Sequence, residues 1–96
     1  MNILTPWSVK AIYDLTDNAI GEAHRMSRSS GVETEVYYCV EDRGEGRRVY
    51  LYVRFLGDDA PKNSTLYARV FEDMQFVNAP HPISLLEYED DEQRAP

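Results

Sequence analysis

Apolar residues recur at spacings of three and four along residues 5–28, a pattern typical of one amphipathic helix. Thr5 and Pro6 suit its start, because a threonine hydroxyl can accept a backbone N–H and proline fits the first helical position. Residues 27–31, a run of serine, arginine and glycine, favour an end to the helix. The apolar stripe consists of Val9, Ile12, Leu15, Ala19, Ile20, Ala23 and Met26.

Three later segments alternate apolar and polar residues, which is the pattern of half-buried strands. They cover residues 32–42, 47–56 and 64–72. Gly44 and Gly46 can adopt positive φ in a hairpin between the first two segments, and a longer loop of turn-forming residues precedes the third. This order predicts an antiparallel meander, in which strands pair in chain order.

Residues 73–86 carry a weaker pattern. Met74 to Val77 fit either a short fourth strand or the end of the third, and the prolines at 80 and 82 interrupt regular structure. Ile83, Leu85 and Leu86 fit a short edge strand. The expected fold class is therefore α+β, with one N-terminal helix packed on a three- to four-stranded antiparallel meander sheet in two layers. We expect one domain over residues 1–86 and a flexible acidic tail over 87–96.

The helix can cover only one face of such a sheet, and the alternation assigns tyrosine and arginine to the other. These side chains are enriched where proteins meet their partners, which makes this face the candidate binding surface. Sheet-on-sheet homodimerisation is one alternative, and an ordinary half-exposed strand surface is another. The candidate residues are Tyr37, Arg48, Tyr50, Tyr52, Arg54, Tyr67 and Arg69.

The charge is uneven along the chain. Seventeen acidic and ten basic residues give −7, and residues 87–96 alone hold five acidic residues and one basic. A net-acidic protein is poorly suited to nonspecific nucleic-acid binding and favours partners with a basic surface. Acidic side chains could also imitate phosphates in a cationic groove, whereas the tail by itself fits a solubilising role. The acidic candidates are Glu33, Glu35, Glu87, Glu89, Asp90, Asp91 and Glu92.

Catalytic and metal-binding patterns are weak. Cys39, His24 and His81 are far apart in sequence, and their spacing does not match a zinc site. The chain lacks the glycine-rich phosphate-binding motifs and the GxSxG motif of hydrolases. We expect no enzymatic activity, no cofactor and no metal. The N-terminus does not resemble a secretory leader and no apolar run is long enough for a membrane span, so we expect a cytoplasmic protein without membrane contact.

The leading functional hypothesis is a small protein-binding module that inhibits or modulates a larger nucleic-acid-handling machine. In general character it resembles the compact acidic inhibitors that phages direct against restriction or CRISPR systems. Such a protein would act by steric and electrostatic blocking. Two alternatives remain open: single-stranded nucleic-acid binding through the tyrosine- and arginine-bearing face, and a homodimeric structural or assembly role.

Overall fold

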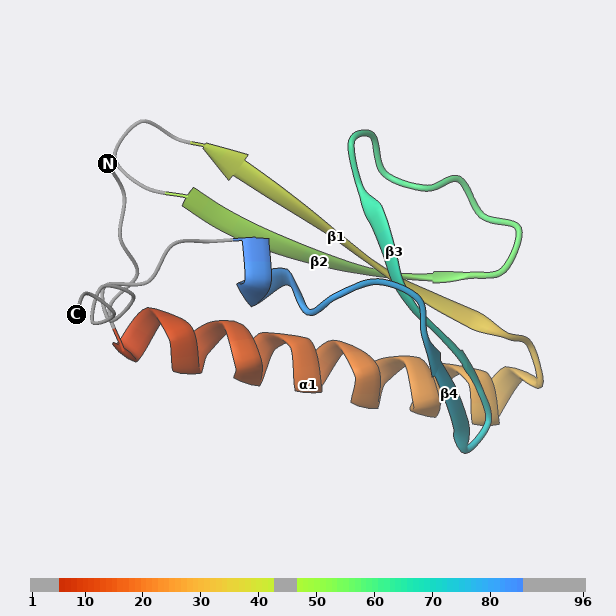
Figure 1. The fold of residues 1–96 in the computed structure, drawn as a ribbon. Helices are drawn as coiled ribbons and strands as arrows, with labels where there is room; N and C mark the ends of the chain where they lie inside the picture. Colours follow the sequence, from red (N-terminus) through yellow and green to blue (C-terminus); the bar gives the residue numbers. More distant parts are fainter. Residues whose placement is uncertain (1–5, 43–46, 86–96) are drawn as a thin grey trace.

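The computed structural model describes residues 6–42 and 47–85, in which one helix lies across one face of an antiparallel sheet (Figure 1). Helix α1 (Pro6–Ser30) forms one layer. The other layer contains β1 (Thr34–Asp42), β2 (Arg47–Phe55), β3 (Thr65–Phe71) and β4 (Met74–Val77). This arrangement confirms the α+β class and the two layers. The expected tail at 87–96 lies outside the described residues.

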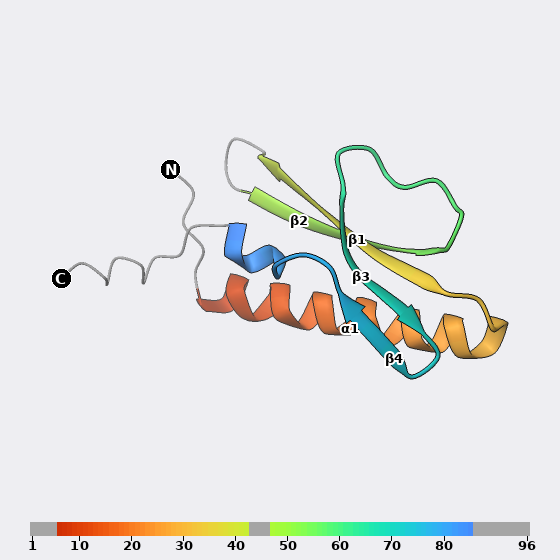
Figure 2. The same ribbon diagram turned by 45° about the vertical axis from the view of Figure 1, so that its right-hand side comes forward.

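The strand order corrects the meander. The sheet runs β2-β1-β3-β4, so β3 pairs with β1 and not with β2. Strands β2 and β3 are both antiparallel to β1 and therefore parallel to each other, and a tight hairpin cannot join parallel strands. Residues 56–64 supply the longer connection, and they lie on the side of the sheet opposite α1 (Figures 1 and 2). The length of this loop is what allows β1 to become a central strand.

The weak pattern after β3 forms two elements. Residues 74–77 do form a fourth strand, paired with β3. Residues Pro82–Leu85 form a 3-10 helix, η1, in place of the expected edge strand. The fixed φ of Pro82 suits a helix start. The His81 carbonyl accepts two hydrogen bonds from Ser84, one from its backbone N–H at 2.9 Å and one from its side-chain hydroxyl at 2.7 Å. Ile83 is thereby buried on the helix side of the sheet, where η1 packs against α1.

Small residues of α1 make its closest approach to the sheet. Ala23 is fully buried together with Val36 and Val70. Thr16 and Ser27 are also buried, although the apolar stripe did not include them. Both hydroxyls have hydrogen-bond partners. Thr16 donates to the Ile12 carbonyl of its own helix at 2.8 Å, and Ser27 accepts the backbone N–H of Glu72, in the turn after β3, at 2.7 Å.

Candidate interaction surface

The pairing of β1 with β2 sets the side chains on the face away from α1. Tyr37 lies opposite Tyr52, and Cys39 lies opposite Tyr50. The pairings of β1 with β3 and of β3 with β4 bring further side chains to the same face. We call this surface the outer face. Its described members are Glu35, Tyr37, Cys39, Glu41, Arg48, Tyr50, Tyr52, Arg54, Leu66, Arg69, Phe71, Met74 and Phe76.

Tyr67 does not belong to the outer face, contrary to the alternation. The register of β1 with β3 shifts between Val36 and Tyr37, so a β-bulge inserts one extra residue into β3. Leu66 becomes the partner of Tyr37, and Tyr67 turns towards α1. There it packs against the core, 6.2 Å from Tyr38 and 5.8 Å from His81 between ring centroids. Burial, with a smaller effect of Asp17, raises the pKa of Tyr67.

The remaining predicted tyrosines and arginines do share the outer face. Tyr37, Tyr50, Tyr52 and Arg54 are half-buried there, and Arg48 and Arg69 are exposed. These predicted residues therefore lie on β1 and β2, except for Arg69, which lies on β3.

The described acidic candidates are already engaged within the domain. Glu33 accepts from Nε of Arg69 at 2.7 Å. Glu35 is only 8% exposed and accepts the Tyr37 hydroxyl at 2.9 Å. Burial and this hydrogen bond raise the pKa of Tyr37. Residues 87–92, which carry the other acidic candidates, lie outside the described part of the chain.

Two arginines of β2 differ from the three described arginines of α1 and β3. Arg25, Arg28 and Arg69 each pair with a carboxylate. Within residues 6–42 and 47–85, Arg48 and Arg54 have no such ion pair. The guanidinium of Arg54 instead donates to the Val53 carbonyl at 3.1 Å and lies 5.4 Å from the centre of the Tyr52 ring.

Sequence reasoning missed the contribution of β4 to the outer face. Phe76 lies opposite Arg69, and Met74 lies opposite Phe71. Their side chains are 59% and 55% exposed, which is unusual for large apolar residues. Residues 74–77 do alternate, but four residues are too few to predict a strand and the face on which each side chain lies.

The nucleophile and histidine candidates do not converge. Cys39 lies on the outer face and is buried, whereas His24 and His81 lie on the helix side of the sheet. His81 stacks on Tyr13 at 4.5 Å between ring centroids. No group of three or more potential metal ligands occurs among the described residues. In the same part of the chain, no helix has the length and apolar character needed to cross a membrane.

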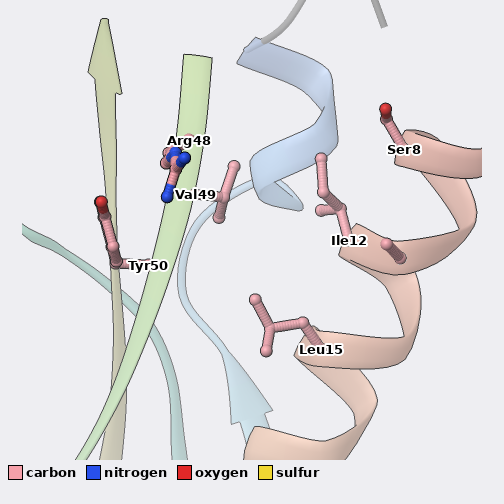
Figure 3. Close-up of a pocket in the computed structure, with 7 residues that line it drawn as sticks. Ser8, Ile12, Leu15, Arg48, Val49 and Tyr50 are labelled. Carbon is pink, nitrogen blue, oxygen red and sulfur yellow. The ribbon is translucent and has the colours of Figure 1, made fainter. Parts of the chain in front are cut away.

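A hollow of about 350 Å³ lies between α1 and β2 (Figure 3). Ile12 and Leu15 point into it from the helix, and Val49 points into it from the strand. Leu15 belonged to the predicted core stripe, yet it is 42% exposed because no described side chain fills this space. Ser8, Ala11, Arg48 and Tyr50 complete the lining.

Among the described residues, the outer face and the hollow beside β2 are the features suited to binding. No family model, curated protein or solved structure matches this chain. Its function must therefore be inferred from these two features.

Proposed function

We propose that the protein is a non-enzymatic protein-binding module whose partner docks on the outer face. One observation carries this proposal: large aromatic side chains occupy a sheet face on which no described helix or strand packs, and the loop at 56–64 passes on that side. Helix α1 contacts β1, β2 and β3, and η1 contacts α1, all on the opposite side. Exposed apolar area on such a face is often a site where a protein binds its partner, because binding removes that area from water.

The chemistry of the outer face suits a protein partner. Tyr50 and Tyr52 supply rigid contact area with few rotatable bonds, and Phe76 supplies a fully apolar anchor. Arg54 lies beside Tyr52 and Arg69 lies opposite Phe76, and both can donate to partner carbonyls or carboxylates. The surface therefore combines aromatic contact area on the two outer strands with polar side chains between and beside it, and protein interfaces mix the two in the same way.

We further propose that the partner belongs to a nucleic-acid-handling machine and that binding blocks its basic surface, as a phage-encoded inhibitor of restriction or CRISPR systems would. The net charge of −7 supports this choice. Because Glu33 and Glu35 have partners inside the domain, residues 87–96 are the stronger source of phosphate-like charge. Deleting 87–96 and raising the salt concentration should each weaken binding. If neither changes the affinity, electrostatic blocking is excluded.

The docking surface can be tested with charge substitutions on the outer face. Tyr52→Glu and Phe76→Glu should abolish capture of the partner from a lysate of the organism that encodes the protein. Val32→Glu is the matched control, because Val32 is 41% exposed and lies off this face. Retention of the partner by all three variants contradicts the proposal. A concentration-dependent dimer that Tyr52→Glu converts to monomer would instead assign the face to a second copy.

Single-stranded nucleic acid is the second candidate, because Arg48 and Arg54 form no ion pair with a described residue and lie on the same face as the half-buried Tyr50 and Tyr52. Fluorescence anisotropy with short oligonucleotides at low salt, the condition most favourable to such binding, decides between the two. Binding that Arg54→Gln removes would favour nucleic acid over a protein partner.

A further inference from the structure

Strand β2 is an outer strand whose backbone is open on one side. It has nine residues and pairs only with β1 within the described chain. The N–H of Leu56 donates to the Glu33 carbonyl at 2.8 Å, which continues the register of β1 with β2. Because backbone groups alternate along an antiparallel strand, those of Val49, Leu51 and Val53 point away from β1.

A side-chain contact confirms this direction. The Val53 carbonyl accepts a hydrogen bond from the guanidinium of Arg54, so it cannot face β1. Apart from this carbonyl, the outward backbone groups of Val49, Leu51 and Val53 pair with no described residue, and an outer strand of this length is a template for another strand. Strand β4 at the opposite edge has only four residues and offers a much shorter template.

The hollow lies beside this open edge on the helix side (Figure 3). The side chains of Val49, Leu51 and Val53 face α1, so a strand added next to β2 would point alternate side chains in the same direction. The side chain opposite Val49 would enter the space between Ile12 and Leu15. An apolar side chain there would cover part of Leu15.

Two arginines of β2 favour acidic residues at the two ends of the added strand. Arg48 and Arg54 project from the outer face at the two ends of the segment that carries the open backbone groups. A carboxylate directly opposite each arginine would gain a cross-strand ion pair. Strand β2 contains three arginines and no acidic residue, so self-pairing between two copies would bring like charges together.

We propose that β2 accepts an extended, acid-flanked segment of another protein as a fifth strand, antiparallel to it. The segment has acidic residues opposite Arg48 and Arg54 and apolar residues opposite Val49, Leu51 and Val53. Its two remaining residues lie beside Tyr50 and Tyr52 and are free to vary. This site shares Arg48 and Arg54 with the outer face, but its backbone edge and the hollow lie apart from Phe76 on β4, so the two sites can be tested separately.

The probe is a capped, fluorescent peptide of sequence Glu-Val-Thr-Val-Thr-Val-Glu, titrated with the full chain by anisotropy. N-methylation of the central valine removes the N–H that faces β2, whereas N-methylation of a threonine removes one that faces away. Loss of the paired N–H should weaken binding about tenfold or more, and the threonine control should bind almost as well as the parent. A peptide with lysine in place of both glutamates should bind more weakly than the parent, and raised salt should reduce the difference.

Protein variants locate the peptide. Leu15→Asp should weaken binding about tenfold, because it puts a carboxylate in the hollow, while the equally exposed Val32→Asp should not. Phe76→Glu on the outer face should leave peptide binding unchanged, which separates this test from that of the proposed function. Circular dichroism of each variant establishes that it is folded.

Three results would overturn the proposal: no binding of the parent peptide, equal effects of the two N-methylations, or wild-type affinity in Leu15→Asp. A dimer of the protein alone that Leu15→Asp dissociates and the peptide competes away would assign the edge to a second copy of the chain instead.

Discussion

His24 on α1 reaches the backbone of Glu72 in the turn between β3 and β4, with Nδ1 2.6 Å from the Glu72 carbonyl oxygen. Its other ring nitrogen lies 2.8 Å from Oε1 of Gln75. Glu72 has a positive φ of 56°, which is uncommon for a residue other than glycine. The imidazole therefore fixes the helix to a turn whose backbone conformation is otherwise unfavourable.

We expect His24→Ala to lower the free energy of unfolding by about 1–2 kcal/mol, because it removes both contacts. Gln75→Ala removes one contact and should cost less. Urea denaturation of the two single variants and the double variant measures the coupling between the residues. Additive effects would show that His24 acts only through Glu72.

Two buried threonines offer a matched comparison. Thr34 is fully buried on β1, and its hydroxyl donates to the Ala23 carbonyl of α1 at 2.9 Å. Thr16 is also buried, but its hydroxyl donates to a carbonyl of its own helix. Thr34→Val should therefore destabilise the protein by about 1–2 kcal/mol, since it removes a bond between the layers, and Thr16→Val should change little. Equal losses in thermal or urea unfolding would contradict this explanation.

The β-bulge predicts different costs for two tyrosines that the sequence pattern placed together. Tyr67 packs between the core and His81, so Tyr67→Ala should cost about 3 kcal/mol. Tyr52 lies on the outer face, and Tyr52→Ala should cost about 1 kcal/mol. Chemical denaturation measures both values. A larger loss for Tyr52 than for Tyr67 would mean that the faces are assigned wrongly.

His81 should make stability depend on pH. Burial lowers its pKa below the usual value, and nearby Asp17 opposes this only in part. Nδ1 accepts the N–H of Ile83, whereas Nε2 is buried with no hydrogen-bond partner among the described residues. The unfolded chain therefore binds a proton more readily than the folded protein does, and stability falls as the pH drops below about 6.5.

The contribution of His81 is fully present above its unfolded pKa and decreases from there down to its folded pKa. His81→Phe keeps an aromatic ring against Tyr13 but cannot be protonated. Urea denaturation at pH 7.5 and at pH 5.5 should show a smaller loss of stability in this variant than in the wild type. Equal losses would show that other groups determine the acid sensitivity.

Local periodicity was sufficient to predict the helix and the three long strands of this fold, but not η1 or the order of the strands in the sheet. The helix and three strands follow from spacings of three to four and of two, because each element exposes its apolar side chains on one face. The position of β3 beside β1 depends on how residues 56–64 cross the sheet, and loop composition does not encode that path. The meander was therefore the simplest expectation and the wrong one.

The candidate surface was predictable for residues whose face follows from an unbroken strand, such as Tyr50 and Tyr52. Tyr67 was assigned to the wrong face because a single inserted residue reverses the alternation. The hollow beside Leu15 was not predictable, because it depends on where α1 crosses the sheet relative to β2. Arg54 was predicted from the strand pattern, but only the three-dimensional arrangement shows that no described carboxylate pairs with it.

The bulge in β3 also decides where the length of this chain can change. Losing the residue at position 67 would restore simple alternation and leave every other side chain of β3 on its present face, because the residues on either side already pair in register with β1. Only the ring that Tyr67 places on the helix side would be lost. The loop at 56–64 can also absorb insertions and deletions without changing the face of any strand residue. Related sequences that keep this fold can therefore vary in length at two places, the loop and the bulge.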